Sequence, residues 1–167
     1  MSFKAVDPNT FTVNPFTLIG KEWLLITAGD EKGFNTMTAS WGGLGVFWNK
    51  NAATIYVRPT RYTKEFLDRN DTFTLSFFTE EYREALALCG RVSGRDVDKV
   101  KETKLTPVFH SGTTYFEEAK LVMVCKKLLH SDLSPSDFDQ SQYDALMYPL
   151  KDYHTLYIGE VLEILEK

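Results

Sequence analysis

Alternation of apolar and polar residues along the chain predicts several β-strands. Residues 72–77 alternate most cleanly, so that Phe73, Leu75 and Phe77 point inward and the hydroxyl-bearing residues between them point outward. Residues 35–41 also alternate, because successive side chains of a strand lie on opposite faces. Apolar runs predict further strands at 23–28, 54–57, 119–129 and 154–165.

Turn and helix signals occupy the intervals between these strands. Residues 29–33 are rich in glycine and charge, so they predict a reversal that makes an opening hairpin. Acidic residues followed by one apolar stripe predict a helix at 80–89, and a second short helix is predicted at about 96–102. Residues 131–148 are polar and predict a long excursion with one weak helix. Gly159 predicts a bulge where the last strand bends.

Several strands with few, peripheral helices predict a mainly β fold, an antiparallel barrel with added helices. The chain has 167 residues, which is the size of one domain, and no linker or repeat divides it. We therefore expect a single domain over residues 1–167.

The strand predicted at 35–41 combines hydroxyl groups with a large aromatic side chain. Its residues are Asn35, Thr36, Met37, Thr38, Ala39, Ser40 and Trp41. Alternation places Thr36, Thr38 and Ser40 on one face, where hydroxyls offer donors and acceptors to the edge of a heteroaromatic ring. The alternative is that threonine favours strands and these hydroxyls face water.

Three glycines, Gly42, Gly43 and Gly45, follow this strand directly. Glycine within a strand marks a bulge or a place where a large group approaches the backbone. A planar cofactor and a tight barrel corner both fit that pattern. The glycines therefore support a ligand site without deciding it.

A second segment predicts an anion site. Arg58 and Arg61 carry permanent positive charges, and arginine presents forked donors that suit phosphate oxygens. Tyr62 and Thr63 add hydroxyls, and we expect Thr63 to cap a helix at 64–69, whose first amides would also attract an anion. The alternative is an exposed basic loop that pairs with nearby carboxylates.

These two segments, in this order and with a strand between them, resemble the flavin reductase-like family of FMN-binding split barrels, and most closely its flavoredoxin-type branch. A third stretch, residues 93–99, is similar to the same branch. The resemblance implies a six-stranded antiparallel split β-barrel that binds FMN noncovalently, as a homodimer with FMN near the interface. It places the 35–41 strand, Arg58, Arg61, Tyr62, Thr63 and Lys99 at the cofactor, and His154 near a nicotinamide.

Composition excludes several other classes of protein. The net charge is -4 and the basic residues are scattered, which argues against a nucleic-acid partner. The first residues lack the apolar core of a signal peptide and no apolar run could cross a bilayer, so we predict a cytoplasmic protein with no membrane partner. Cys89 and Cys125 have no close neighbour in the sequence and are interpreted as buried small hydrophobes. No ligand-like spacing predicts a metal site.

Three functional hypotheses follow. The first is an NAD(P)H-dependent flavin reductase-like enzyme that takes hydride from NADH or NADPH and passes electrons to a second acceptor. The second is a flavoredoxin-type FMN carrier that a redox protein partner reduces; the absence of a Gly-x-Gly-x-x-Gly fingerprint does not decide between them. The third is a barrel that has lost its cofactor and serves only in binding.

Overall fold

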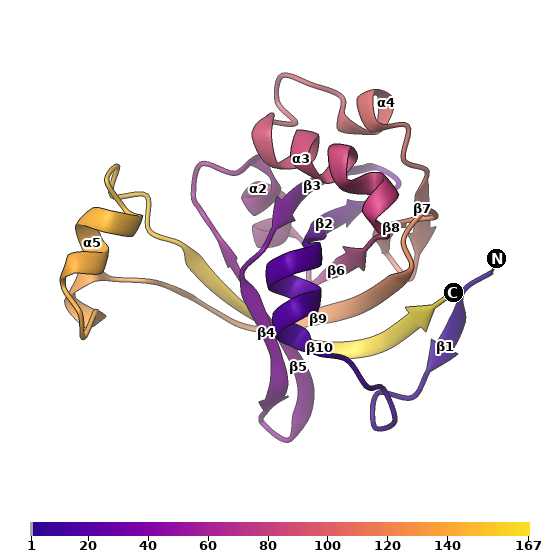
Figure 1. The fold of residues 1–167 in the computed structure, drawn as a ribbon, viewed down its shortest axis with the longest axis horizontal. Helices are drawn as coiled ribbons and strands as arrows, with labels where there is room; N and C mark the ends of the chain where they lie inside the picture. Colours follow the sequence, from indigo (N-terminus) through magenta and orange to yellow (C-terminus); the bar gives the residue numbers. More distant parts are fainter. Residues whose placement is uncertain (1) are drawn as a thin grey trace.

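The computed structural model describes residues 2–167, and one antiparallel sheet forms its centre (Figure 1). The strands of this sheet are β1 (Lys4–Val6), β2 (Leu24–Asp30), β3 (Gly33–Ala39), β4 (Gly42–Phe47), β5 (Lys50–Val57), β6 (Thr72–Phe77), β9 (Leu121–Asp132) and β10 (Thr155–Glu166). Their order is β3-β2-β6-β9-β10-β5-β4, with β1 paired to β10. The predicted mainly β split barrel is confirmed, and within the described part of the chain its sheet has eight strands where six were expected.

The sheet stays open where the chain passes from β3 to β4. These two strands lie at opposite ends of the strand order, although only Ser40 and Trp41 separate them in the sequence. The chain therefore crosses the split of the barrel at these two residues, and their side chains do not lie inside a continuous strand.

Short helical segments and one hairpin complete the fold, and most of them lie against the sheet. The hairpin consists of β7 (Pro107–His110) and β8 (Thr113–Phe116). The helical segments are α1 (Pro15–Thr17), η1 (Leu18–Glu22), α2 (Tyr62–Arg69), η2 (Glu80–Tyr82), α3 (Arg83–Arg91), α4 (Lys99–Thr103), η3 (Pro135–Asp137) and α5 (Gln142–Met147). No helix within residues 2–167 is long and apolar enough to span a bilayer.

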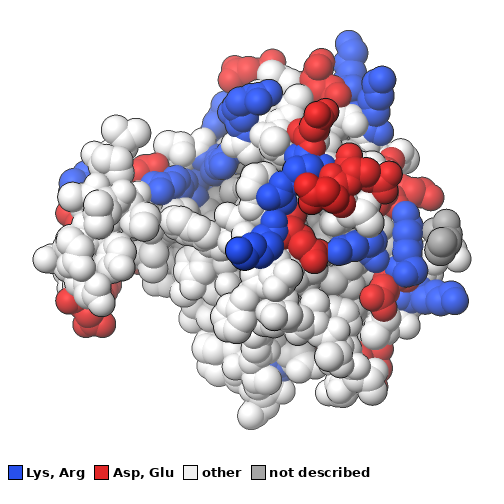
Figure 2. Space-filling model, in the orientation of Figure 1, with Lys and Arg blue, Asp and Glu red and all other residues white. Residues whose placement is uncertain are grey.

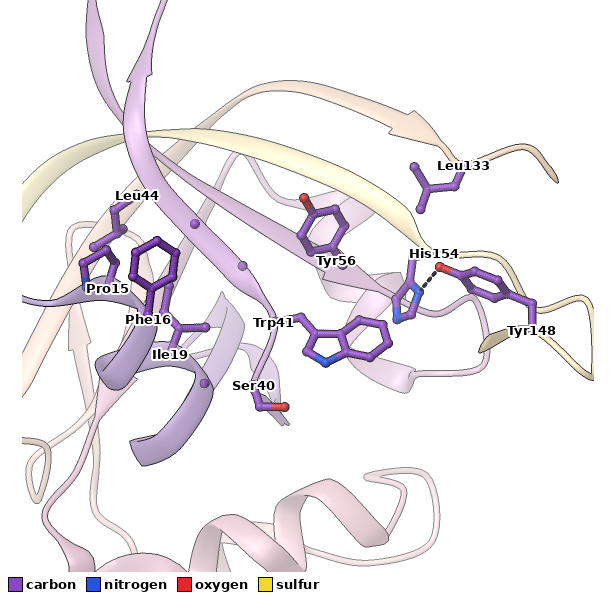
Figure 3. Close-up of a pocket in the computed structure, with 13 residues that line it drawn as sticks. Pro15, Phe16, Ile19, Ser40, Trp41, Leu44, Tyr56, Leu133, Tyr148 and His154 are labelled. Atoms are coloured by element: carbon purple, nitrogen blue, oxygen red, sulfur yellow. Dashed lines mark hydrogen bonds between the residues drawn. The ribbon is translucent and has the colours of Figure 1, made fainter. Parts of the chain in front are cut away.

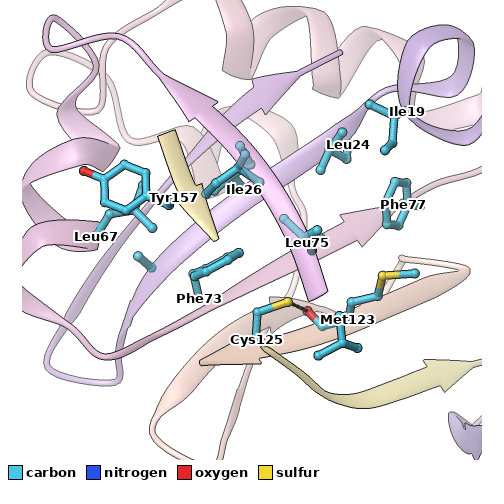
Figure 4. Packing of buried hydrophobic residues seen from close by; sticks show 14 of the residues in the cluster. Ile19, Leu24, Ile26, Leu67, Phe73, Leu75, Phe77, Met123, Cys125 and Tyr157 are labelled. Atoms are coloured by element: carbon cyan, nitrogen blue, oxygen red, sulfur yellow. Dashed lines mark hydrogen bonds between the residues drawn. The ribbon is translucent and has the colours of Figure 1, made fainter. Parts of the chain in front are cut away.

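The interior of the barrel is filled by the inward faces of its strands. Phe73 and Phe77 of β6 lie in one buried cluster with Ile26, Leu67 and Tyr157 (Figure 4). Burial of such side chains stabilises the fold by roughly 1.5–3 kcal/mol each. This cluster holds the strands in place around the split.

A second buried cluster packs against the outer face of the sheet. It joins Leu25 and Val122 of the sheet to Leu86 and Cys89 of α3 and to Phe116 of β8. Cys89 is a free, buried thiol whose pKa burial raises to about 11, and Cys125 is also free and buried, which confirms their interpretation as small hydrophobes. The outer cluster fixes α3 over the sheet.

Several predicted elements are confirmed. The strand at 72–77 has the predicted bounds, and a register shift at Gly159 confirms the bulge in β10. A Cβ at Gly159 would lie 2.7 Å from the ring of Phe73, so glycine lets that ring pack against the strand. The helix predicted at 80–89 is present as η2 followed by α3. The excursion at 131–148 holds one short helix, α5, as predicted.

Three details of the prediction are wrong. The hydroxyls of β6 do not face water, because Thr74 is buried and donates to the carbonyl oxygen of Thr114 in the covering hairpin. The opening turn is shorter than 29–33, since β2 continues to Asp30 and β3 begins at Gly33. The helix expected at 96–102 begins only at Lys99. Outer layers that the alternation pattern does not reveal account for the buried hydroxyls.

Residues 133–153 project from the body of the molecule between β9 and β10 (Figure 1). This segment, which we call the arm, carries η3 and α5. Its return to the sheet delivers His154 to the start of β10, next to the split of the barrel. The arm therefore contributes to the surroundings of the predicted site.

Candidate cofactor site

A cavity of ≈ 350 Å³ lies between the start of α2 and the segment that follows α3. We call it the cationic cavity, because four of its lining side chains are basic and none is acidic. It is lined by Met37, Arg58, Thr60, Arg61, Tyr62, Thr63, Arg91, Val92, Ser93, Gly94 and Lys99. Sequence segments 58–63 and 91–99, far apart in the chain, are thus brought together.

Lys99 is the most deeply buried cation of this cavity. Only 6% of the residue is exposed, and its Nζ donates to the carbonyl oxygens of Thr36 at 2.7 Å and Cys89 at 2.9 Å. Arg61 is half-buried, and its Nη1 donates to the carbonyl oxygen of Gly90 at 2.7 Å. Both side chains are held by neutral carbonyls, and among the described residues neither forms an ion pair.

Burial shifts the titration of both cations in the direction of the neutral form. Desolvation lowers the pKa of Lys99 to about 8, and the neighbouring Arg61 contributes to the same shift. Burial followed by the charge of Arg58 lowers the pKa of Arg61, although an arginine remains charged. Positive charge buried without a carboxylate is costly, and a bound anion would remove that cost.

Arg58 takes a different position from that expected of a phosphate ligand. Its Nη1 lies 2.8 Å from Oδ1 of Asp152, and its Nη2 donates to the carbonyl oxygen of Met147 at 2.9 Å. The guanidinium also lies over the ring of Tyr148, 5.0 Å from its centroid. Arg58 therefore binds the arm, while Arg61, three residues later, faces the cationic cavity without an acidic partner.

Thr63 does not cap the helix, which corrects that prediction. Arg61 occupies the N-cap position of α2, and Thr63 lies inside the first turn. The hydroxyl of Thr63 is buried and accepts from Nδ2 of Asn35 at 2.7 Å. The contact connects the start of α2 to β3; Thr63 lines the cationic cavity, whereas Asn35 lies behind it and does not line it.

The hydroxyl face of β3 is turned toward the protein. Thr36 donates to the carbonyl oxygen of Ile26 at 3.2 Å, and Thr38 donates to the carbonyl oxygen of Leu86 in α3. These hydroxyl protons are therefore used inside the fold. β3 ends at Ala39, so Ser40 and Trp41, which were predicted to belong to this strand, lie outside it.

Residues 37–41 border a second, smaller cavity of ≈ 190 Å³, which we call the bridging cavity. It shares Met37, Arg58 and Arg61 with the cationic cavity. It is also lined by Thr38, Ala39, Ser40, Trp41, Tyr56 and His154. Residues of both predicted segments thus line the bridging cavity.

The glycines near the site differ in whether the surrounding structure leaves room for a side chain. A Cβ at Gly42 would lie 2.7 Å from the carbonyl oxygen of Thr54, which is the close approach of a barrel corner. Gly43 and Gly45 have no atom within 4 Å of that position, so nothing in the fold requires them. At Gly94, a Cβ would lie 2.0 Å from Oδ1 of Asn35, so only glycine lets this loop close over the cationic cavity.

A third cavity of ≈ 520 Å³ is drawn in Figure 3, and it shares Ser40, Trp41, Tyr56 and His154 with the bridging cavity. We call it the apolar pocket, because no Asp, Glu, Lys or Arg lines it. Its lining residues are Pro15, Phe16, Ile19, Gly20, Ser40, Trp41, Gly42, Gly43, Leu44, Tyr56, Leu133, Tyr148 and His154. The indole of Trp41 is 47% exposed and forms part of the wall.

His154 lies between the indole of Trp41 and the ring of Tyr148 (Figure 3). Its Nδ1 is 2.8 Å from the hydroxyl oxygen of Tyr148. Burial, and then the positive charge of Arg58, lowers the pKa of His154 to about 4. The imidazole is therefore neutral at neutral pH and lines both the bridging cavity and the apolar pocket.

Comparison with known proteins identifies the family of the chain. Residues 17–167 match the family model described as the flavin reductase like domain. The chain belongs to this family. The resemblance noted in the sequence is thereby confirmed. A search of curated proteins finds no match to the chain.

Solved structures share the flavin reductase-like fold. An FMN-binding domain of a flavin reductases-like enzyme from Shewanella baltica OS155 superposes with a TM-score of 0.69 at 17% identity, over 98% of this chain and 76% of that one. Flavoredoxin of Desulfovibrio vulgaris (Miyazaki F) superposes with a TM-score of 0.68 at 20% identity, over 87% of this chain and 69% of that one. An FMN-binding protein from Thermus thermophilus, with bound 1-cyclohex-2-enone, gives 0.67 at 20% identity, over 99% and 80%.

Four residues around the site of this flavin reductase-like domain were not singled out from the sequence. Arg91 lines the cationic cavity, and its basic position beside the 93–99 motif was an available signal. Tyr56, Tyr148 and Asp152 surround His154 and Arg58. The two arm residues gave no signal, because nothing in the pattern of the arm connects it to residues about ninety positions earlier.

Proposed function

We propose that this flavin reductase-like chain binds FMN noncovalently and is an oxidoreductase that transfers electrons through it. The observation that carries the proposal is the cationic cavity, in which Arg61, Arg91 and Lys99 have no carboxylate partner among the described residues. FMN offers a dianionic phosphate, and its ring becomes anionic when reduced. A ligand of that charge would compensate the buried cations.

The residues present fit such a cofactor in size and chemistry. The cationic cavity and the bridging cavity share Met37, Arg58 and Arg61 in their linings. One ligand could therefore place an anionic end in the cationic cavity and a flat end in the bridging cavity. In this arrangement Arg61, Arg91 and Lys99 would hold negative charge. Trp41 would cover one part of the ring and exclude water from it.

FMN, when bound, supplies hydride and single-electron chemistry. The protein contributes position and charge. Lys99, anchored by two carbonyl oxygens, holds its ammonium at a fixed place, and Gly94 allows the loop to lie close against Asn35. A fixed cation favours whichever state of a ligand carries more negative charge. We therefore expect the bound cofactor to be easier to reduce than free FMN.

The first test compares FMN with riboflavin, which lacks the phosphate. Purified apoprotein is titrated with each flavin, and quenching of flavin fluorescence reports binding. We expect FMN to bind at least tenfold more tightly, because one charge-assisted contact is worth roughly 1.5–3 kcal/mol. We also expect added salt to weaken FMN more than riboflavin. Equal affinities for the two flavins, or no binding of either, would contradict the proposal.

The finer role follows from a second measurement. We propose that NADH or NADPH reduces the bound FMN directly, with His154 near the nicotinamide; the alternative is a flavoredoxin-type carrier that receives electrons from a redox protein. Anaerobic mixing of the FMN-loaded protein with NADH or NADPH separates the two. Prompt loss of the oxidised flavin spectrum supports the reductase, and an unchanged spectrum supports the carrier.

We also propose a homodimer with the cofactor near the interface. The β4–β5 hairpin exposes Val46 and Trp48, and the arm exposes Tyr143, Leu146 and Leu150. In Figure 2 the surface around that hairpin has few charged side chains, whereas charge gathers over the region of α3 and α4. Exposed apolar patches of this kind are typical of protein interfaces, and a second copy supplies an equally apolar face.

The dimer is tested by light scattering on Val46→Lys and Leu150→Lys. We expect each variant to shift the protein toward the monomer and to weaken FMN binding. The control is Phe109→Ser, an exposed aromatic of β7 at the opposite side of the molecule from the arm (Figure 1). A wild-type protein that is monomeric at all concentrations would contradict this part of the proposal.

A further inference from the structure

We propose that Lys99 is a covalent modification site, whose amine forms an imine with a small aldehyde that carries a phosphate group and binds in the cationic cavity. This inference goes beyond the proposed function, because it concerns the amine of Lys99 as a nucleophile rather than its charge as a contact for FMN. It stands on the cavity itself and does not require that FMN binds.

Lys99 differs from the other lysines in its surroundings. Among the described residues it is the only buried lysine, with 6% of the residue exposed. A neighbouring carboxylate favours the protonated ammonium, and four other lysines have such a partner: Lys50, Lys64, Lys120 and Lys151. Lys99 forms no ion pair within residues 2–167, so no opposite charge stabilises its protonated form.

Two backbone carbonyls orient the amine. The Nζ of Lys99 donates to the carbonyl oxygen of Thr36 at 2.7 Å and to that of Cys89 at 2.9 Å. A neutral primary amine has two N–H groups and one lone pair. When both N–H groups are used by these carbonyls, the lone pair is directed away from them. Because the side chain lines the cationic cavity, a fixed nucleophile borders a space that can hold a ligand.

Burial also leaves part of the amine neutral. Desolvation is the largest cause that lowers the pKa of Lys99 to about 8. About a tenth of Lys99 is therefore neutral at pH 7, whereas an exposed lysine with its ordinary pKa is neutral in less than about one molecule in a thousand. Lysines that are buried in this way are the ones that act as nucleophiles and form Schiff bases in proteins.

The arginines of the same cavity favour an aldehyde that carries a phosphate. Arg61 and Arg91 line the cavity and have no carboxylate partner in the described part of the chain. Arginine presents forked donors that suit phosphate oxygens. A phosphate bound there would hold the attached aldehyde in the same ≈ 350 Å³ cavity as the amine of Lys99. Proximity of this kind makes the reaction effectively unimolecular and so accelerates it.

A second cavity beside Lys99 is less suitable for this ligand. It has a volume of ≈ 570 Å³ and shares Gly94 and Lys99 with the cationic cavity. Its lining contains three carboxylates, those of Glu31, Asp96 and Asp98. Carboxylates repel a phosphate, so a phosphorylated aldehyde prefers the cationic cavity, which has no acidic side chain.

The covalent step is an addition followed by the loss of water. The lone pair of Nζ forms a bond to the aldehyde carbon, the electrons of the C=O double bond move to its oxygen, and that oxygen takes one proton from the nitrogen. The hydroxyl then leaves with the second nitrogen proton as water, which gives the imine. No atom is oxidised or reduced. A protonated imine keeps one N–H, which can still donate to one of the two carbonyls that hold Lys99.

The test uses pyridoxal 5'-phosphate, an aldehyde with a phosphate group, and pyridoxal, which lacks the phosphate. Each is added to the full chain without FMN, borohydride reduces the imine to a stable amine, and mass spectrometry of peptides locates the modified lysine. We expect pyridoxal 5'-phosphate to modify Lys99 at a concentration at least about tenfold lower than pyridoxal, because pyridoxal lacks the charge-assisted contacts. Modification spread over the exposed lysines, or equal reaction of the two aldehydes at Lys99, would overturn the inference.

Variants identify the amine and the phosphate contact separately. Lys99→Arg keeps a positive charge but cannot form an imine, so we expect the imine absorbance to be lost. The matched control is Lys101→Arg, at an exposed position of the same helix α4, which should leave the absorbance unchanged. Arg61→Gln should weaken the reaction with pyridoxal 5'-phosphate and leave that with pyridoxal as it is. Peptide mapping of the wild-type chain gives the same information if Lys99→Arg does not fold.

Added FMN separates this inference from the proposed function. Both ligands would use Arg61, so saturating FMN is expected to protect Lys99 from pyridoxal 5'-phosphate. Equal modification with and without bound FMN would place the aldehyde outside the cationic cavity and overturn the inference. FMN binding, together with no modification of Lys99 in the absence of FMN, would also overturn it and leave the proposed function standing. Modification of Lys99 in a chain that does not bind FMN would support the inference and overturn the proposed function.

Discussion

The cationic cavity and the apolar pocket lie on opposite sides of one bridging cavity, yet they have opposite chemistry. The cationic cavity is lined by four basic side chains and no acidic one, whereas the apolar pocket has no charged side chain. The boundary between them passes through Arg58, whose charge is neutralised by Asp152 of the arm. The ion pair between Arg58 and Asp152 therefore lies at the boundary between a basic cavity and an uncharged pocket.

Burial lowers the pKa of one titratable group in each region, but the charge that results at neutral pH differs. Burial lowers the pKa of Lys99 to about 8 and that of His154 to about 4. At neutral pH the lysine remains charged and the histidine is neutral, because their ordinary pKa values lie on opposite sides of it. Desolvation, the largest cause of both shifts, thus leaves one cavity with a cation and the other with a neutral imidazole.

The largest effect that separates the regions is expected from Arg61→Gln. Glutamine retains a donor for the carbonyl oxygen of Gly90 but removes the charge. We expect the dissociation constant for FMN to rise roughly tenfold to a hundredfold, since a hydrogen bond to a charged group contributes about 1.5–3 kcal/mol. Fluorescence titration measures it.

Two comparisons make this result specific. Riboflavin affinity is expected to change less than FMN affinity in Arg61→Gln, because riboflavin lacks the phosphate. Lys50→Ala removes an equally positive charge from an exposed pair with Glu160 and should leave FMN affinity as it is. Equal losses in Arg61→Gln and Lys50→Ala would mean that only overall charge matters.

A smaller effect is expected from Asp152→Asn, which releases Arg58 from its ion pair. The freed guanidinium would add its charge to the bridging cavity, so we expect FMN to bind roughly threefold to tenfold more tightly. The matched control is Asp144→Asn, another arm carboxylate that pairs with Lys151. Weaker FMN binding in Asp152→Asn would show instead that the ion pair positions the arm for the cofactor.

The parts of the fold that could be predicted are those that a local sequence pattern determines without help from distant residues. The alternation over 72–77 decides both the existence and the inward face of β6, and that strand has the predicted bounds. Arg61 and Lys99 were identified from their motifs, and the structure brings them to one cavity. The local signal did not reveal what covers a face, so the hydroxyls of Thr38 and Thr74 were expected to be open and instead donate to carbonyl oxygens of covering elements.

The apolar pocket was not predictable, for a physical reason. Its polar wall depends on a contact between Tyr148 and His154, and its neutrality depends on a contact between Arg58 and Asp152. The second pair joins residues 94 positions apart. These residue types are common, and the arm has no periodicity of its own. The contacts form only because β5 and β10 pair in the folded sheet.

Lys99→Met tests the charge of the cationic cavity through the pH dependence of stability. Because the folded pKa of about 8 is below the ordinary value of 10.5, the unfolded chain holds more protons between these values, and stability rises with pH across that window. We expect the wild-type urea midpoint to rise relative to Lys99→Met from about pH 8 upward. FMN affinity should fall over the same range in wild type alone.

Cys89 is the control for this prediction, because burial raises the pKa of its thiol to about 11 and its contribution therefore has the opposite sign. Cys89→Ala leaves Lys99 in place and is expected to retain the rise in midpoint that begins near pH 8. A flat difference between wild type and Lys99→Met would mean that Lys99 does not lose its proton in this range.

An effect of similar size is expected on the apolar side, from His154→Phe in acid, because the pKa of His154 is shifted about as far as that of Lys99. The folded pKa of about 4 is below the ordinary value of 6.5, so the unfolded chain takes up a proton first as the pH falls through this window. Wild type should therefore lose stability between about pH 6.5 and pH 4, and His154→Phe should lack that part of the loss.

Tyr148→Phe separates burial from hydrogen bonding, since it removes the hydroxyl that contacts Nδ1 but leaves the imidazole covered. Burial is the larger cause of the shift, so Tyr148→Phe should have a lower urea midpoint at every pH and keep the wild-type slope. A slope that disappears in Tyr148→Phe would instead make the hydroxyl, rather than the apolar surroundings, responsible for the neutral imidazole.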